Sequence, residues 1–171
     1  MSRHINIRMK KKKETAEAKR LRFAREWAHQ RDISNWLASR FDGRPSVSIR
    51  IDLQAARVER GVFLTIDEHQ ATKLANRLRN EINQFVFGNA ARRHGKQLPV
   101  TIAFHQEPQP HLHILVGQSD RFTLAELSKF VEHFCTRNSW VKSSFYCEET
   151  RSIGAAQMYN SRHGADSVVT F

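Results

Sequence analysis

Two histidines on one predicted strand carry the clearest chemical signal in this sequence. They lie in the segment Pro110-His111-Leu112-His113-Ile114-Leu115-Val116. Because alternate residues of a strand face the same side of a sheet, the two imidazoles should point together while Leu112 and Ile114 point into the core. Two imidazoles placed in this way form a bidentate metal site. The His-x-His pattern is also common in ordinary strands, so two half-exposed histidines without a metal are the alternative interpretation.

The preceding strand offers a third ligand. Leu98–Glu107 is predicted to be extended, and the turn Pro108-Gln109-Pro110 should join it to His111–Gly117 as a hairpin. Within the preceding strand, His105 and Glu107 have the same parity, and both remain candidates for completing the site. Imidazole plus carboxylate suits Mn²⁺ or Mg²⁺, with positions left open for phosphate oxygens, and Zn²⁺ is the less favoured alternative.

The sequence contains only two tyrosines, Tyr146 and Tyr159. Tyr146 lies in the predicted strand SSFYCEE, where an aromatic side chain usually packs. Tyr159 lies on a short predicted helix, 152–163, with alanines one turn before it and Arg162 one turn after it. The small neighbours would let this helix lie close to a sheet, and Arg162 could stabilise a phenolate or a phosphate. A phenol can attack phosphorus where a metal polarises the phosphate, whereas a packing tyrosine is the alternative.

Alternating strands and helices must position these residues. Ser46–Leu53 (SVSIRIDL) alternates strictly between apolar and polar residues and is predicted to be a half-buried strand. Capping-box patterns at Thr65-x-x-Glu68 and Thr123-x-x-Glu126 open two predicted amphipathic helices. With the hairpin and a later strand at 142–148, the order is β-α-β-β-α-β. This order predicts an α+β domain over residues 46–171, with a central antiparallel or mixed sheet of about five strands and flanking helices.

Positive charge is concentrated at the N-terminus. The chain has 28 Lys+Arg against 17 Asp+Glu, a formal charge of +11, and residues 1–45 hold 13 of the cations against 5 of the acids. Helical composition from 14 to 41, with Leu21 and Trp27 on one face, predicts a basic helical arm over 1–45. Such an arm attracts phosphate through counterion release, although a solubilising tail has the same composition. The predicted DNA-contacting cations are Lys10, Lys11, Lys12, Lys13, Lys19, Arg20, Arg92, Arg93 and Lys96.

Several classes of protein are excluded. No apolar run approaches the roughly 18 residues of a membrane span, and no apolar segment of a secretory signal follows the basic N-terminus. Cys135 and Cys147 form neither a disulfide framework nor a zinc cluster. The glycine-containing segment 88–95 before Lys96 has the wrong spacing for a P-loop, and no Ser or Thr follows that lysine. These features predict a reduced, cytoplasmic domain that binds a polyanion.

A His-hydrophobic-His strand in the order β-α-β-β-α-β, followed by a tyrosine on a short helix, resembles the HUH endonucleases. Within them the sequence is similar to the Rep type with one catalytic tyrosine, which initiates rolling-circle replication. The resemblance covers about 46–171 and implies that His111 and His113 bind a metal together with Glu107 or His105. It further implies that Tyr159 is the nucleophile. Arg162 replaces the family's usual lysine and keeps the charge, but it cannot release a proton.

The resemblance implies a metal-dependent endonuclease and strand transferase acting on single-stranded DNA or an origin hairpin. Cleavage would leave a 5′-phosphotyrosyl link and a free 3′-hydroxyl, with no nucleotide required. A plasmid, phage or other mobile element would be the source, and a host helicase and polymerase would be the partners. Two alternatives remain open: a non-catalytic HUH-like protein that binds or regulates DNA, and a tyrosine transposase of the same superfamily.

Overall fold

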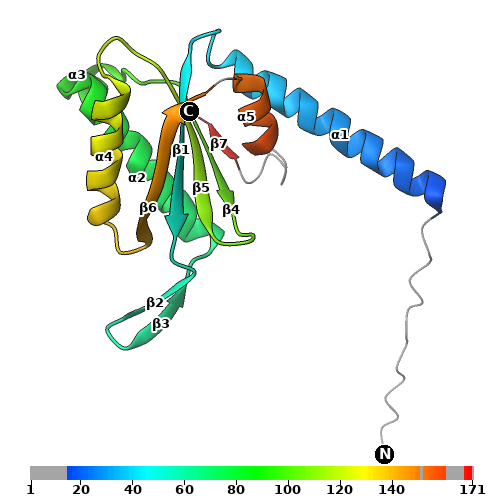
Figure 1. The fold of residues 1–171 in the computed structure, drawn as a ribbon, viewed down its shortest axis with the longest axis horizontal. Coiled ribbons are helices and arrows are strands. Elements are labelled where there is room, and N and C mark those ends of the chain that lie inside the picture. The colour runs from blue at the N-terminus through cyan, green and yellow to red at the C-terminus, as the bar shows by residue number, and fades with distance from the viewer. Residues whose placement is uncertain (1–14, 151, 161–167, 171) are drawn as a thin grey trace, which may run out of the picture.

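A computed structural model describes residues 15–150, 152–160 and 168–170. Five helices and seven strands lie within these ranges (Figure 1). In chain order they are α1 (Ala16–Ser39), β1 (Ser46–Leu53), β2 (Ala56–Glu59), β3 (Val62–Thr65), α2 (Glu68–Phe87), α3 (Asn89–His94), β4 (Val100–His105), β5 (His111–Gly117), α4 (Leu124–Thr136), β6 (Val141–Glu149), α5 (Ile153–Asn160) and β7 (Val168–Thr170).

Five of the strands form one sheet in the order β6-β1-β5-β4-β7, and every pairing in it is antiparallel. The predicted α+β class with an antiparallel central sheet and flanking helices is therefore confirmed. The predicted order β-α-β-β-α-β is present as β1, α2, β4, β5, α4 and β6. Three further features lie outside this order: the hairpin β2–β3, the short helix α3 and the edge strand β7.

The sheet has two faces with different coverings. On β1 the apolar residues Val47, Ile49, Ile51 and Leu53 are fully buried, as their alternation predicts. They join one core with apolar residues of α2 and α4, such as Leu78, Ile82, Val131 and Phe134. Figure 1 shows α2 and α4 on one face of the sheet, while α5 and α1 lie on the other. The polar residues of the strands therefore face α5.

The hairpin β2–β3 projects from one end of the sheet (Figure 1). Its two-residue turn places Arg60 and Gly61 at φ 50° and 79°. Positive φ at both central positions is what a type I′ turn requires, and its twist matches that of the flanking strands. Residues 54–60 show no clear strand periodicity in the sequence, because the hairpin has no fully buried face: Val58 and Phe63, which pair across it, are both exposed.

One of the two predicted capping boxes is present. Thr123 and Glu126 cap α4 reciprocally, as predicted. The box predicted at Thr65 and Glu68 is wrong, because Asp67 caps α2 through a hydrogen bond from the Gln70 amide to its carboxylate, 2.7 Å long. Thr65 instead ends β3, where it pairs with Ala56.

Helix α1 is continuous over 24 residues and is buried only toward its C-terminus. Ser34 and Leu37 are buried, and the Ser34 hydroxyl donates to the Gly154 carbonyl of α5 at 3.1 Å. Leu21 and Trp27, expected on one apolar face, are both more than half exposed. The predicted arm is thus docked on α5 at one end and projects from the sheet at the other (Figure 1). Among the described helices, none combines the length and the apolar character needed to cross a membrane.

Candidate active site on the histidine face of the sheet

Three histidines lie together on the face of the sheet that α5 covers. His105 on β4 is the direct cross-strand partner of His111 on β5, and His113 follows two residues later on the same face. The His105 and His111 rings stack with centroids 5.1 Å apart. The His113 ring stands edge-on to both, with centroids 5.5 Å from His105 and 5.2 Å from His111. The hairpin β4–β5 therefore gathers three imidazoles into one cluster.

Strand parity explains this placement. Leu112 and Ile114 on β5, and Ile102 on β4, point into the core and are buried. The residues between them must then face the other side. His105 and His111 are each only 1% exposed, whereas His113 is partly exposed. The cluster thus has a deep end, formed by His105 and His111, and a more accessible end at His113.

The tautomer of His111 follows from its backbone contact. Its Nδ1 lies 2.7 Å from the Gln109 carbonyl oxygen. A carbonyl oxygen can only accept a hydrogen bond, so Nδ1 carries the proton and donates. In the neutral ring, Nε2 then holds the lone pair that a metal ligand needs, and a carbonyl contact of this kind commonly orients a metal-binding histidine.

The two candidates for a third ligand occupy different environments. His105 ends β4 and contacts both other histidine rings. Glu107 lies two residues beyond the end of β4, exposed in the bend that leads to β5. Across the part of the chain that is described, no three His, Cys, Asp or Glu side chains present their donor atoms in a ready metal-binding arrangement. The chemistry of the donor set, three imidazoles at 5.1–5.5 Å, nevertheless fits a divalent transition-metal ion.

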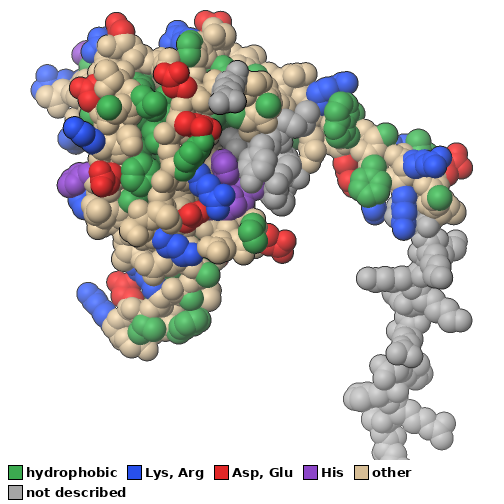
Figure 2. Space-filling view, viewed as in Figure 1, with side chains coloured by type: hydrophobic (Ala, Val, Ile, Leu, Met, Phe, Trp, Pro, Cys, Tyr) green, Lys and Arg blue, Asp and Glu red, His purple; other side chains and the backbone are tan. Residues whose placement is uncertain are grey.

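A pocket of about 510 Å³ opens beside His113. Arg50 of β1 is the cross-strand partner of both His113 on β5 and Tyr146 on β6, so all three face this pocket. Arg50 Nε donates to Asp52 at 2.9 Å, and the Ser144 hydroxyl donates to the other Asp52 oxygen at 3.1 Å. Figure 2 shows histidine side chains at the surface here, next to basic and acidic ones. The pocket therefore combines a guanidinium, an imidazole and a phenol.

Tyr146 is placed differently from what its sequence suggests. A strand tyrosine was expected to pack, and its neighbours Phe145 and Cys147 do pack against the core. Tyr146 points to the opposite face, is 50% exposed and lines the pocket beside His113. Its ring therefore forms part of the wall of that pocket.

Helix α5, which includes the backbone of the second tyrosine, packs on the same face of the sheet. The buried Gln157 side chain donates to the Thr101 hydroxyl of β4 at 3.2 Å, and Thr101 has the same strand parity as His105. The backbone of Tyr159 continues α5 two residues later. Its side chain and the whole of Arg162 lie outside the described residues, as do Lys10, Lys11, Lys12 and Lys13.

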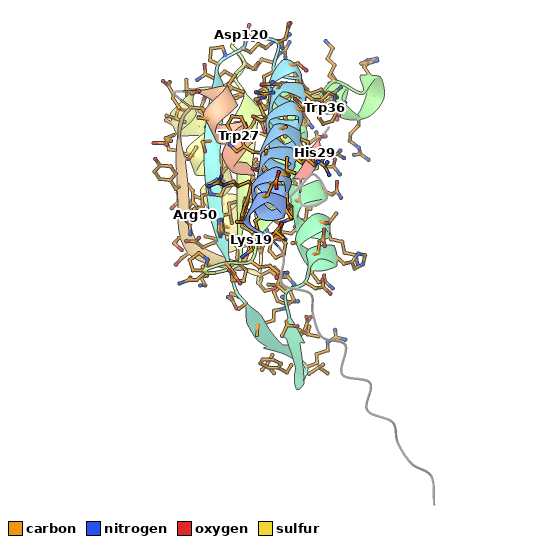
Figure 3. The ribbon with its side chains drawn as sticks, turned by 90° about the vertical axis from the view of Figure 1, so that its right-hand side faces the viewer. Lys19, Trp27, His29, Trp36, Arg50 and Asp120 are labelled. Carbon is orange, nitrogen blue, oxygen red and sulfur yellow. The ribbon has the colours of Figure 1, made fainter. Side chains whose placement is uncertain are left out.

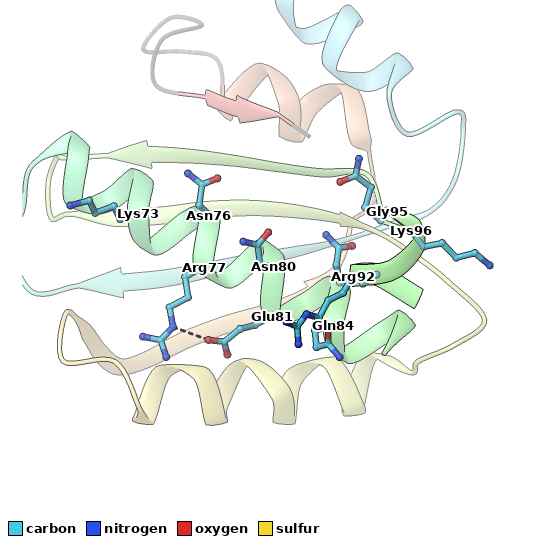
Figure 4. A pocket seen from close by; sticks show the side chains of 12 residues that line it. Lys73, Asn76, Arg77, Asn80, Glu81, Gln84, Arg92, Gly95 and Lys96 are labelled. Atoms are coloured by element: carbon cyan, nitrogen blue, oxygen red, sulfur yellow. Dashed lines mark hydrogen bonds and ion pairs between the residues drawn. The ribbon is translucent and has the colours of Figure 1, made fainter. Parts of the chain in front are cut away.

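The predicted basic loop lies away from the histidines. Arg92 and Lys96 line a polar groove of about 750 Å³ between α2 and the segment around α3, and Arg93 is exposed on the same short helix (Figure 4). Lys73 and Arg77 of α2 add two more cations to this groove, and Arg77 is paired with Glu81 at 2.8 Å. Because α2 covers the core face of the sheet, the groove and the histidine cluster belong to different layers. Lys19 and Arg20 lie on the projecting part of α1.

Sequence reasoning missed Arg50, Asp52 and the exposed position of Tyr146. The alternation in SVSIRIDL already placed Arg50 and Asp52 on the polar face of β1. What the pattern lacked was the strand order, which sets β1 between β5 and β6.

Comparison of the chain with protein-family models, curated proteins and solved structures gave no significant match. The functional assignment therefore depends on the residues and geometry of this face.

Proposed function

We propose that this protein is a metal-dependent endonuclease and strand transferase that cuts single-stranded DNA at a particular sequence or structure through a phosphotyrosyl intermediate. In this proposal it belongs to the HUH type and initiates replication of a plasmid, phage or other mobile element. The observation that carries the proposal is the cluster of His105, His111 and His113 on the sheet face that α5, the helix bearing Tyr159, also covers.

The substrate class follows from charge. The chain carries a formal charge of +11, and described cations occur on α1, beside the histidines and along the groove near α3. A polyanion is the natural partner of such a surface, because binding releases its condensed counterions. A single strand fits better than a duplex at the histidine face, since the reacting phosphate has to enter the pocket that β1, β5 and β6 form beside His113.

The proposed reaction is a transesterification. The Tyr159 hydroxyl oxygen bonds to phosphorus, and the bond from phosphorus to the 3′-oxygen of the preceding nucleotide breaks. The products are a 5′-phosphotyrosyl ester and a 3′-hydroxyl, with the phenol proton ending on the released oxygen by way of solvent. One phosphate ester replaces another, so the step needs no nucleotide, and a 3′-hydroxyl can reverse it.

Side chains around the pocket take defined roles in this proposal. The three histidines would hold a divalent ion after their rings turn to converge on it. The expected preference for Mn²⁺ or Mg²⁺ over Zn²⁺ depends on a carboxylate ligand; with three imidazoles alone, Mn²⁺ or Zn²⁺ would fit, and Mg²⁺ would need Glu107 as well. The ion would supply Lewis-acid stabilisation of charge on the non-bridging phosphate oxygens. Arg50 would bind the same phosphate by its guanidinium, while Asp52 and Ser144 hold that guanidinium in place.

Covalent trapping tests the proposal. The purified protein is incubated with labelled single-stranded DNA and, in separate reactions, Mn²⁺, Mg²⁺ or Zn²⁺, then denatured, and the adduct is located by peptide mapping. We expect an adduct on Tyr159 that Tyr159→Phe abolishes while DNA binding remains, because the substitution removes only the hydroxyl. Tyr146→Phe is the matched control and should leave the adduct in place.

The remaining outcomes are equally informative. An adduct on Tyr146 would keep the enzyme class but move the nucleophile to β6, where Tyr146 lines the same pocket as His113. Strong binding of single-stranded DNA with no adduct on either tyrosine, at any of the three metals, would overturn the enzymatic proposal. The protein would then be a non-catalytic DNA-binding or regulatory protein.

A further inference from the structure

One stripe of helix α1 changes from buried to exposed along its length. Phe23, Trp27, Gln30, Ser34 and Leu37 follow one another at intervals of four, three, four and three residues, which places them on one face of a helix. Ser34 and Leu37 are buried at 3% and 1% exposure where the helix meets α5. Phe23 and Trp27, on the same stripe, are 60% and 57% exposed. The helix face that packs on α5 thus extends beyond the contact, where it presents the exposed rings of Phe23 and Trp27.

Basic side chains surround these two rings. Between Ala16 and Arg31 the helix carries five Lys or Arg residues and two Glu residues. The Arg22 guanidinium lies 5.4 Å from the centre of the Phe23 ring, and that of Arg31 lies 5.5 Å from the Trp27 ring. Figure 2 shows apolar and basic side chains interspersed along the projecting helix. Cations over aromatic rings next to open ring surface are typical of sites where bases stack and phosphates are neutralised.

The charge of α1 decides between the candidate occupants. A second copy of the helix, packed stripe against stripe, would bring two sets of five cations together, and like charges at such an interface are unfavourable. An apolar peptide would leave the cations without a counterpart. A single nucleic acid strand satisfies both features, because its bases stack on rings while its phosphates meet guanidinium and ammonium groups.

We propose that Phe23 and Trp27 form a base-stacking platform for the single-stranded DNA that the histidine face cleaves. This inference deepens the proposed function and rests on it. The stripe runs from the platform to α5, the helix that bears Tyr159, so a strand stacked on α1 is led toward the sheet face with the histidines. The platform would hold the strand without reading its sequence, because every base has a face that can stack.

Trp36 supplies a matched control. It is 55% exposed, close to the value for Trp27, and lies nine residues farther along α1. Nine residues of an α-helix correspond to a rotation of about 180°, so the two indoles lie on opposite faces, and Figure 3 shows them on opposite sides of the helix. Both can be changed to alanine without loss of helix propensity.

The experiment measures binding of a labelled oligothymidylate of about 20 nucleotides by fluorescence anisotropy, over a range of salt concentrations. Trp27→Ala and Phe23→Ala should each weaken binding about fivefold or more, the lower end of the measured effect of losing one base–aromatic stack. The slope of log K against log salt should stay unchanged, because no ionic contact is lost. Trp36→Ala should bind like the wild type, whereas Arg20→Gln should lower the slope by about 0.7.

Three outcomes would overturn the platform. Trp27→Ala and Trp36→Ala could bind equally well, or the salt slope could fall with the loss of Trp27. The protein could also sediment as a dimer that Trp27→Ala dissociates, which would assign the stripe to a second copy. Adduct formation with Tyr159 is scored in parallel. An intact adduct with no effect of Trp27→Ala rejects the platform alone, whereas DNA binding without any adduct rejects the nuclease and leaves the platform measurable.

Discussion

His105 and His111 are direct partners across β4 and β5, and their rings stack with centroids 5.1 Å apart and planes inclined by only 11°. This relationship comes from the register of one hairpin. His113 joins the pair because it is two residues from His111 on the same strand face. A single hairpin thus supplies all three imidazoles, and α5, which includes the backbone of Tyr159, packs on the same face of the sheet.

Removal of His113 should abolish metal binding without unfolding the protein. In the wild type, Mn²⁺ at 100 times its dissociation constant should raise stability by about 2.7 kcal/mol, seen as an increase in Tm. His113→Ala should lose this increase because it removes a ligand from the accessible end of the cluster. His69→Ala, at an exposed position on α2, is the control and should keep it. An unchanged Mn²⁺ response in His113→Ala would contradict the site.

A comparison of His105→Ala with Glu107→Ala should identify the third ligand. His105 contacts both other rings, whereas Glu107 is exposed beyond the end of β4. We therefore expect His105→Ala to weaken Mn²⁺ binding on the order of tenfold or more, as losses around a metal site commonly do, and Glu107→Ala to have little effect. Isothermal titration calorimetry measures the Mn²⁺ dissociation constant of each variant. A larger loss of affinity in Glu107→Ala than in His105→Ala would assign Glu107 to the site.

Asp52→Asn should impair the reaction more than it impairs stability. The Arg50–Asp52 ion pair is 2.9 Å long but partly exposed, with 40% and 24% of the two side chains accessible. Such a pair contributes about 0–1 kcal/mol, so chemical denaturation should change little. The rate of adduct formation should fall on the order of tenfold, because Arg50 is no longer fixed toward the pocket. A parallel loss of stability and rate would instead indicate a structural role.

Two glycines should respond in opposite ways to alanine. A Cβ on Gly117 would lie 2.6 Å from Cγ of Pro99, so the β5 end would have to shift. Gly117→Ala should therefore lower the free energy of unfolding by about 1–3 kcal/mol. A Cβ on Gly154, in helix α5, meets no atom within 4 Å, and Gly154→Ala should be neutral or stabilise by up to about 1 kcal/mol. Urea denaturation measures the free energy of unfolding of both variants, and an equal loss in the two would contradict the prediction.

The contribution of the α4 capping box to the stability of the protein should depend on pH. Hydrogen bonds from the Thr123 backbone and side chain hold the pKa of Glu126 below its usual value. A carboxyl group with a lowered pKa in the folded state stabilises the protein above its unfolded pKa, and this contribution is lost as the pH falls through the folded pKa. Thr123→Ala should therefore be more destabilising at pH 7 than at pH 3. Equal destabilisation at both values would show that the charge of Glu126 contributes nothing.

Both cysteines should be unreactive in the folded protein. Burial raises the pKa of Cys135 and of Cys147 to about 11, with the charge of Glu132 adding to the effect at Cys135. At pH 8 roughly one thiol in a thousand would be ionised, so modification by a disulfide reagent should be slow until the chain is unfolded. Stability should also fall as the pH rises above 9, because the folded state disfavours the thiolate. Rapid labelling of two thiols in the native protein would contradict this.

The sequence by itself determined the features that depend on local periodicity. Alternation in SVSIRIDL and HLHILVG fixed which residues of β1 and β5 enter the core and which face outward, because a strand has a period of two. The spacing Thr123-x-x-Glu126 likewise located the start of α4. From these patterns the α+β class, the hairpin and the common direction of His111 and His113 could all be predicted.

Only the tertiary structure decided which strands and helices are neighbours. The place of β1 between β5 and β6 brings Arg50 and Tyr146 to His113, residues that are separated by up to about a hundred positions in the chain. Docking of α1 on α5 buries Leu37 and leaves Trp27 open, although both belong to the same helical stripe. Periodicity describes one element at a time, whereas the pocket and the burial of a helix face depend on long-range packing, which one element's pattern does not contain.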